Sequence, residues 1–250
     1  MAAPLLLFLL LPLLALVSYS SPSEIIADLG RPEVRQAIVL SLRTSSWATV
    51  ASVILGTPAA YLLARRQFPG KLLVDNLIDL PIVLPPAVSG IALLLVFGRR
   101  GWIGNWLDDF GVRITFTETA VVIAQTFIAV SLFIRAASIG FAAVEPELED
   151  AAAIDGANRW QVFWKMTLPL SRQAVLTGVA LAWARALGEF GATIIFAGNF
   201  PGRTQTMPLA IYLGFELDLG VAVTLSVILV ALSFLILLFV KALFQRETIE

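Results

Sequence analysis

Long apolar stretches recur along the 250-residue chain and constrain its fold more than any other sequence feature. Hydrophobic residues make up 58% of the chain and charged residues only 14%, whereas a soluble domain carries about a quarter charged residues. Several stretches are long enough to cross the hydrocarbon layer of a membrane, which is roughly 30 Å thick. The sequence therefore predicts an all-α integral membrane protein.

Six apolar segments are expected to span the membrane within a single transmembrane domain, residues 1–250. These spans cover residues 5–19, 41–64, 77–97, 119–139, 175–196 and 221–243. The first segment is short and could instead be a cleaved signal peptide, although no basic residue precedes it. Between the spans, residues 20–40 are expected to be a mixed polar segment on the external side, and 98–118 and 199–220 are expected to be loops.

Prolines interrupt the third span. Pro81, Pro85 and Pro86 fall within six residues and exclude a regular helix there. Irregular backbone at membrane depth is tolerated inside protein or beside a water-filled path. A kinked helix end and a translocation path are therefore both open interpretations of this region, which continues into Ser89 and Gly90.

Two charged residues, Arg185 and Glu189, lie in the otherwise apolar fifth span. Ionisable groups inside a membrane usually face protein or water, and an i, i+4 spacing lets the two side chains neutralise each other. The pair is interpreted as a structural ion pair, with a place on a translocation path as the alternative. Gln125 and Thr193 are further polar candidates for such a path, although ordinary interhelical hydrogen bonds also explain them.

The composition excludes several classes of function. The chain has no cysteine and no histidine, so it has no thiolate or imidazole for a metal site or for catalysis. The Gly70-Lys71 pair is followed by Leu72 and forms no P-loop. A net charge of −1 suggests no nucleic-acid partner. We expect no catalytic site, metal or cofactor in this chain; Glu189 and Asp79 are weak candidates for an intramembrane enzyme.

A polar loop, residues 145–169, separates two long apolar segments. Pro146 and the acidic residues after it suit a helix start, and Gly156 suits a helix stop. Asn158 and Gln161 form a capping-box pattern for a second helix, which Pro169 is expected to end. By spacing, one side of the second helix carries Trp160, Phe163, Trp164 and Thr167.

The charge distribution predicts the orientation. Six spans place both termini on one side, together with the polar loop. Nine basic residues fall on that side: Arg65, Arg66, Lys71, Arg135, Arg159, Lys165, Arg172, Lys241 and Arg246. Six fall on the other: Arg31, Arg35, Arg99, Arg100, Arg113 and Arg203. The positive-inside rule therefore places the polar loop and both termini in the cytoplasm.

The polar loop also resembles the cytoplasmic "EAA" loop of ABC importer permeases, which docks on the ATPase subunit in that family. The matching positions are Asp150-Ala151-Ala152, Gly156, Met166 and Leu168-Pro169. Asp150 stands where the family usually has Glu, and Met166 where it has Ile or Leu. The resemblance implies a type I importer permease fold; the alternative is an amphipathic loop that packs on its own domain or on lipid.

Three further segments, 57–71, 79–98 and 185–212, resemble the molybdate-type branch of these permeases. The resemblance implies import of molybdate, with tungstate as a related cargo, across the inner membrane. It also implies a homodimer, two cytoplasmic ATPase subunits that bind ATP and magnesium, and an external molybdate-binding protein. A sulfate or thiosulfate permease of the same fold is the alternative, and a passive anion channel is a weaker one.

Two sets of site residues follow. The residues expected to contact the ATPase are Asp150, Ala151, Ala152, Gly156, Ala157, Trp160, Phe163, Met166, Leu168 and Pro169. The candidates for the translocation path are Pro85, Pro86, Ser89, Gly90, Gln125, Arg185, Glu189 and Thr193.

Overall fold

The computed structural model describes residues 3–245, and every element in that range is a helix. The ends of the predicted domain, 1–2 and 246–250, lie outside the described residues, and Arg246 of the charge count lies there too. The helices are α1 (Ala3–Tyr19), α2 (Pro22–Leu29), α3 (Pro32–Arg65), α4 (Lys71–Val83), α5 (Pro86–Phe97), α6 (Trp102–Asp109), α7 (Glu118–Ala143), α8 (Pro146–Ile154), α9 (Arg159–Val162), a π-helix (Phe163–Thr167), α10 (Leu168–Leu170), α11 (Arg172–Leu187), α12 (Gly191–Phe196), α13 (Met207–Leu217) and α14 (Leu219–Gln245).

Three helices, α3, α7 and α14, are long and apolar enough to cross a membrane by themselves. The bent pairs α1–α2 and α4–α5 raise the number to at most five if each pair counts as one span. This criterion rests on length and composition, so the number of six spans stays a prediction.

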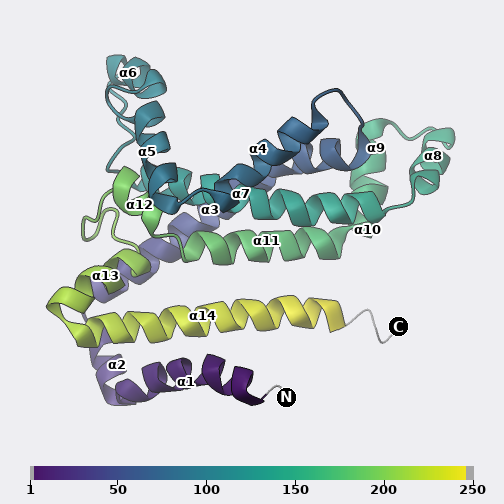
Figure 1. Cartoon of the computed structure of the whole chain (residues 1–250). Helices are drawn as coiled ribbons and strands as arrows, with labels where there is room; N and C mark the ends of the chain where they lie inside the picture. Colours follow the sequence, from purple (N-terminus) through teal and green to yellow (C-terminus); the bar gives the residue numbers. More distant parts are fainter. Residues whose placement is uncertain (1–2, 246–250) are drawn as a thin grey trace.

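The core lies where α3, α7 and α11 run side by side (Figure 1). Phe133 and Phe141 fill its centre with no exposed surface. Around them, small residues let the helices approach closely. A Cβ atom added at Gly56, for example, would lie 2.7 Å from the Phe133 ring. The buried alanines of this core are Ala48, Ala60, Ala129, Ala137, Ala182 and Ala186.

Three segments expected between the spans are partly helical. Residues 98–118 contain α6. Residues 20–40 contain α2, and α3 begins at Pro32 rather than near residue 41. Residues 199–220 contain α13, whose Met207 is fully buried. α2 and α13 each start with a proline near the first position, where the missing N–H of proline is not needed. The loop expectation was wrong here because polar residues in these segments mark helix ends rather than long connections.

The third and fifth spans are both broken. α4 and α5 meet at an angle of 113° around Leu84–Pro85, which confirms that this span is not a regular helix. Pro81, however, lies inside α4 without ending it. The fifth span was expected to be continuous over 175–196, and this was wrong. α11 ends at Leu187 and α12 begins only at Gly191.

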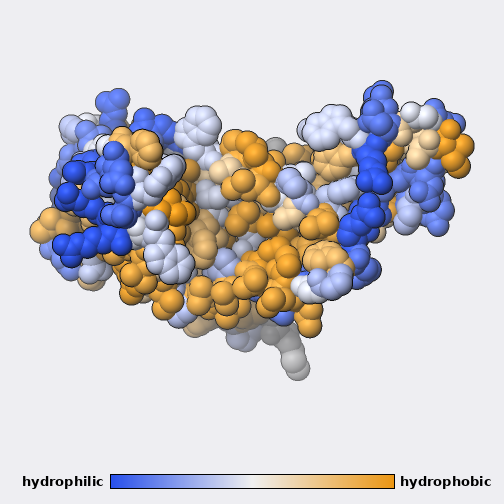
Figure 2. All heavy atoms as spheres, turned by 90° about the horizontal axis from the view of Figure 1, so that it is seen from above, coloured by the Kyte–Doolittle hydropathy of each residue, from blue (hydrophilic) through white to orange (hydrophobic). Residues whose placement is uncertain are grey.

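The molecule has two polar ends. α6 and α8 lie at opposite ends in Figure 1. Figure 2 shows hydrophilic residues gathered at both ends, with a mainly hydrophobic region between them. This distribution suits a chain whose middle lies in lipid and whose ends meet water.

Candidate functional site

The first half of the polar loop folds as predicted. Pro146 occupies the first turn of α8, and Glu147 and Glu149 lie in the same turn, where negative charge is favoured. Gly156 follows the helix with φ of +90°, a backbone conformation that side-chain-bearing residues rarely adopt. The predicted helix stop at Gly156 is thereby confirmed.

The second half begins as predicted and then departs from the prediction. Asn158 caps α9, and its backbone and side chain exchange hydrogen bonds of 2.9 Å with Gln161, which confirms the capping box. The turn then widens into the π-helix. Pro169 was expected to end the helix, and this was wrong, since it lies in the first turn of α10, where no N–H is required of it.

The aromatic residues of this segment face two directions rather than one. Trp160 and Trp164 point outward with 70% and 48% of their surface exposed, and their rings lie 5.5 Å apart. Phe163 turns inward, with its ring 5.3 Å from that of Tyr61 and 5.8 Å from that of Phe141. The predicted common face was wrong because Phe163 packs between the helices, although its ring also lies 5.5 Å from that of Trp164.

A small ionic network ties the polar loop to the end of α3. Arg65 Nη2 and Thr167 Oγ1 both donate to Glu149 Oε1, each over 2.6 Å. The Arg65 and Glu149 side chains are only 12% and 15% exposed. The sequence predicted Glu149 only as a helix-start charge, because nothing local pointed to Arg65. The basic group at 65–71, on the same predicted side, was the available signal.

The ten residues predicted to contact the ATPase divide by exposure. Asp150, Ala151, Gly156, Trp160 and Pro169 are exposed, whereas Ala152, Ala157, Phe163, Met166 and Leu168 are half-buried. Phe163 and Leu168 pack against the α3–α7–α11 core. These two therefore help to hold the polar loop in place, while part of their surface stays accessible.

The residues predicted for a path gather around the two broken spans. α12 packs closely against α5. A Cβ atom added at Gly191 would lie 2.5 Å from Pro86 Cβ, and one at Gly90 would lie 2.8 Å from Ile195 Cβ. Pro85 and Pro86 themselves are exposed at the start of α5. Only glycine permits this close approach of the two short helices.

The predicted Arg185–Glu189 ion pair is present. Arg185 Nη1 donates to Glu189 Oε2 over 2.7 Å, although Glu189 lies in the break after α11 rather than within one helix. Glu189 Oε1 accepts the N–H of Ala192 over 2.9 Å, and its side chain is 1% exposed. The glutamate therefore satisfies a backbone donor at the start of α12 as well as pairing with the arginine.

Three buried polar side chains in this region have unused hydrogen-bonding atoms. The side-chain polar atoms of Ser89, Gln125 and Thr193 find no partner within residues 3–245, although none of the three residues is exposed. The expected interhelical hydrogen bonds are therefore not formed. Leaving such a group unpaired costs about 1–3 kcal/mol. α5, α7 and α12, which carry the three side chains, contact one another.

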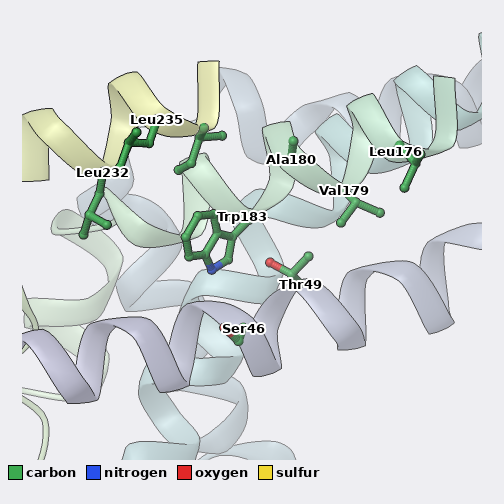
Figure 3. Close-up of a pocket in the computed structure, with 9 residues that line it drawn as sticks. Ser46, Thr49, Leu176, Val179, Ala180, Trp183, Leu232 and Leu235 are labelled. Carbon is green, nitrogen blue, oxygen red and sulfur yellow. The ribbon is translucent and has the colours of Figure 1, made fainter. Parts of the chain in front are cut away.

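A separate groove of about 540 Å³ lies between α3, α11 and α14 (Figure 3). Its lining is largely apolar, with Trp183 beside Thr49 and Ser46. The hydroxyls of Ser46 and Thr49 both donate to carbonyls of their own helix over 2.7 Å. A tetrahedral anion needs several convergent N–H or O–H donors, so this groove does not suit one. Within residues 3–245, no group of three or more acidic residues is placed to hold a metal ion.

Comparison with known proteins agrees with these features. Residues 52–249 match the family described as binding-protein-dependent transport system inner membrane component. The chain is 44% identical over 206 residues to the molybdenum transport system permease protein ModB of Escherichia coli (strain K12), covering 81% of this chain and 90% of that protein. It is 36% identical to the sulfate transport system permease protein CysT of the same strain, covering 96% and 88%.

The fold also matches a solved structure. A bacterial ABC transporter involved in the import of the acidic polysaccharide alginate superposes with a TM-score of 0.71 at 16% identity, over 96% of this chain and 91% of that one. At this identity the likeness concerns the fold alone.

Proposed function

Because the chain belongs to the family of binding-protein-dependent transport system inner membrane components, we propose that it is the membrane subunit of an ATP-driven molybdate importer. The chain is an ABC importer permease with the type I fold. The finer assignments are the cargo, the partners, the path and the orientation, and each has its own support.

The proposal rests on how the polar loop exposes two tryptophans on a segment that is anchored to the core. Trp160 and Trp164 are exposed, while Phe163 and Glu149 anchor the same segment to α3 and α7. Exposed aromatic residues on a rigid support are typical anchors of a protein interface. We assign this surface to a cytoplasmic ATPase subunit, which supplies the site for ATP and magnesium. A passive anion channel would have no use for an outward-facing pair of tryptophans.

The cargo assignment follows from the relatives. The molybdenum permease relative is more similar than the sulfate permease relative, at 44% against 36% identity. Molybdate and sulfate are both tetrahedral dianions and need the same kinds of donor. Molybdate with tungstate is therefore the preferred cargo, and sulfate is the second candidate.

The path is assigned to the region where α5, α7 and α12 meet. Ser89, Gln125 and Thr193 offer unpaired donors and acceptors there. In a second conformation, water or an oxyanion can satisfy these atoms once α5 and α12 separate. Arg185 and Glu189 are assigned to the support of α12 rather than to cargo contact, because each already has a partner.

The assembly proposed for import contains two copies of this chain, two ATPase subunits and an external molybdate-binding protein. The polar loop and both termini face the cytoplasm in this arrangement, as the excess of basic residues on that side favours. ATP binding by the ATPase pair moves the polar loops and opens the path outward, and hydrolysis resets it.

ATP hydrolysis by the assembled complex in vesicles tests the cargo. The permease is reconstituted with its candidate ATPase and binding protein, and molybdate, tungstate or sulfate is added in turn. We expect stimulation by molybdate and tungstate and none by sulfate. Stimulation by sulfate alone would contradict the cargo while leaving the importer intact, and a complex without the permease is the control.

A further inference from the structure

We propose that one face of α3 binds an anionic phospholipid of the outer leaflet, with the lipid phosphate at two arginines and an acyl chain in the apolar cleft below them. This face, the α3 stripe, consists of Arg35, Val39, Arg43, Trp47, Val50 and Ile54. Successive members lie three or four residues apart, so they share one side of the helix. The inference rests on the proposed function only for the choice of leaflet, because the proposed orientation places the start of α3 outside the cell.

The charges of α3 mark the two boundaries of the hydrocarbon layer. No charged residue lies between Arg43 and Arg65. At about 1.5 Å of rise per residue, this part of the helix is roughly 33 Å long, which matches a hydrocarbon layer roughly 30 Å thick. Arg43 therefore lies at the outer boundary, and Ile54 lies roughly 16 Å deeper, near the middle of the membrane.

The outer part of the α3 stripe borders a cleft of about 400 Å³ with polar groups in its lining. Arg35, Gln36, Arg43 and Gly202 are among the residues that line it. Within residues 3–245, Arg35 forms no ion pair, whereas Arg43 Nη2 donates to Glu118 Oε2. Arg35 is exposed, and the Arg43 side chain is 54% exposed. Both guanidinium groups can thus donate charge-assisted hydrogen bonds to a phosphate.

The inner part of the α3 stripe borders a second cleft, of about 500 Å³, between α3 and α7. Trp47, Val50 and Ile54 line it and are 61%, 46% and 65% exposed. Glu118, the partner of Arg43, lines the same cleft, so their ion pair joins the two clefts. The acyl chains of one leaflet fill about half of the hydrocarbon layer, or roughly 15 Å. The apolar part of the α3 stripe has this length.

A phospholipid fits the joined clefts better than two other occupants do. A free oxyanion would use the arginines but would leave the apolar cleft unfilled. A second copy in an isologous contact across this face would place identical residues opposite each other at equal depth, so arginine would meet arginine and the like charges would repel. An anionic phospholipid satisfies both the cations and the apolar wall, since anionic headgroups attract arginines near the membrane surface.

Quenching of Trp47 fluorescence tests the inference. The complex of permease and ATPase is reconstituted in phosphatidylcholine vesicles with increasing fractions of phosphatidylglycerol or phosphatidylcholine that carries brominated chains. Bromine quenches a tryptophan only at short range, and the difference between the wild type and W47F isolates Trp47 from the other tryptophans. We expect half-maximal quenching by brominated phosphatidylglycerol at a mole fraction about tenfold lower than by brominated phosphatidylcholine.

Three variants separate the lipid site from a general effect of charge. R35Q removes a cation that has no ion pair to lose, and it should reduce the preference for phosphatidylglycerol by about threefold, half of the tenfold effect on a free-energy scale. R35Q/R43Q should abolish the preference. R100Q removes an exposed arginine that lines neither cleft and should keep the full preference. Co-purification of the ATPase with each variant in the wild-type ratio shows that the variants fold and assemble.

The contrary results are distinct. Equal quenching by the two lipids in the wild type, or an unchanged preference in R35Q, would overturn the inference. A lack of Trp47 quenching by either lipid would overturn it in favour of a second copy that covers this face. Loss of the preference on addition of molybdate or phosphate at constant ionic strength would overturn it in favour of a free oxyanion. A complex that no oxyanion stimulates would overturn the proposed function alone, because quenching does not depend on transport.

Discussion

Gly156 is the residue at which the polar loop is most open to a partner. Its φ is +90°, and among the described residues only its own chain neighbours come within 4 Å of a Cβ atom placed there. Gly70 has the same two properties, with φ of +84° and open space around it. The two glycines therefore carry similar backbone strain on substitution, but only Gly156 lies in the polar loop.

We predict that Gly156→Leu lowers ATP-driven molybdate uptake by at least about tenfold, as loss of about 1.4 kcal/mol of docking energy would do. The added side chain meets nothing in the chain itself, so the effect arises at the ATPase. Gly70→Leu imposes a comparable strain of roughly 1–2 kcal/mol and should leave uptake near the wild-type level. Equal uptake by the two variants at equal membrane abundance would contradict the docking role.

Local chemistry made several residues predictable. The Asn158–Gln161 capping box and the Arg185–Glu189 pair both depend on short sequence spacing, and both are present. Glu149 shows the limit, since its partner Arg65 lies 84 positions away and only the fold brings them together. The inward packing of Phe163 was equally hidden, because its ring partners Tyr61 and Phe141 lie on other helices.

At the scale of elements, one side chain of α7 makes the ion pairs that tie α4 to it, and Ile78 of α4 packs against the core. Within the described chain, α4 buries no residue. Arg135 of α7 donates to the Asp75 carboxylate over 2.7 Å and to the two oxygens of Asp79 over 2.5 and 2.6 Å. It also donates to the Asp75 carbonyl over 2.9 Å. A planar guanidinium offers five donors in a fixed fork, which lets it serve both carboxylates and the carbonyl at once.

We predict that Arg135→Lys loosens α4 without unfolding the core. Loss of a hydrogen bond between charged groups costs about 1.5 kcal/mol or more, so amide exchange in α4 should rise by about tenfold while α3 and α11 keep their protection. Arg43→Lys, which alters another arginine pair between α3 and α7, should leave α4 unchanged. Hydrogen exchange measured by mass spectrometry tests this prediction, and unaltered exchange in α4 would refute this role of Arg135.

The breaks in the spans were predictable only in part. The three prolines at 81, 85 and 86 predicted an irregular third span, because proline removes a backbone donor and clashes with the preceding turn. The break at 188–190 carries no proline. Gly191 packs closely against Pro86 of α5, and glycines at 188 and 191 also allow the chain to leave the helix.

The whole molecule places two polar ends about an apolar middle, as Figure 2 shows. The membrane class and the helical fold were predictable because composition and hydropathy act over the entire length. The number of spans was harder to derive, since two of the predicted spans consist of short helices joined at breaks.

We predict that the two ends label from opposite sides of the membrane. The natural chain has no cysteine, so single cysteines can be introduced without background. Asn105→Cys on α6 should react with a membrane-impermeant maleimide in intact cells, and Gln67→Cys beside α3 should react only in inverted vesicles. Both positions are exposed, and the unmodified chain serves as the control. The reverse pattern would contradict the proposed orientation.

The π-helix of the polar loop separates two tasks within five residues. Its inward side, with Phe163 and Thr167, fits the core and the α3 end, whereas Trp164 on the outward side joins Trp160 at the surface. Substitutions on the outward side therefore need not disturb the packing beneath. Such a division would let the outer surface diverge between related transporters while the inner one stays fixed, and it offers a place where a permease could be re-engineered to accept a foreign motor subunit.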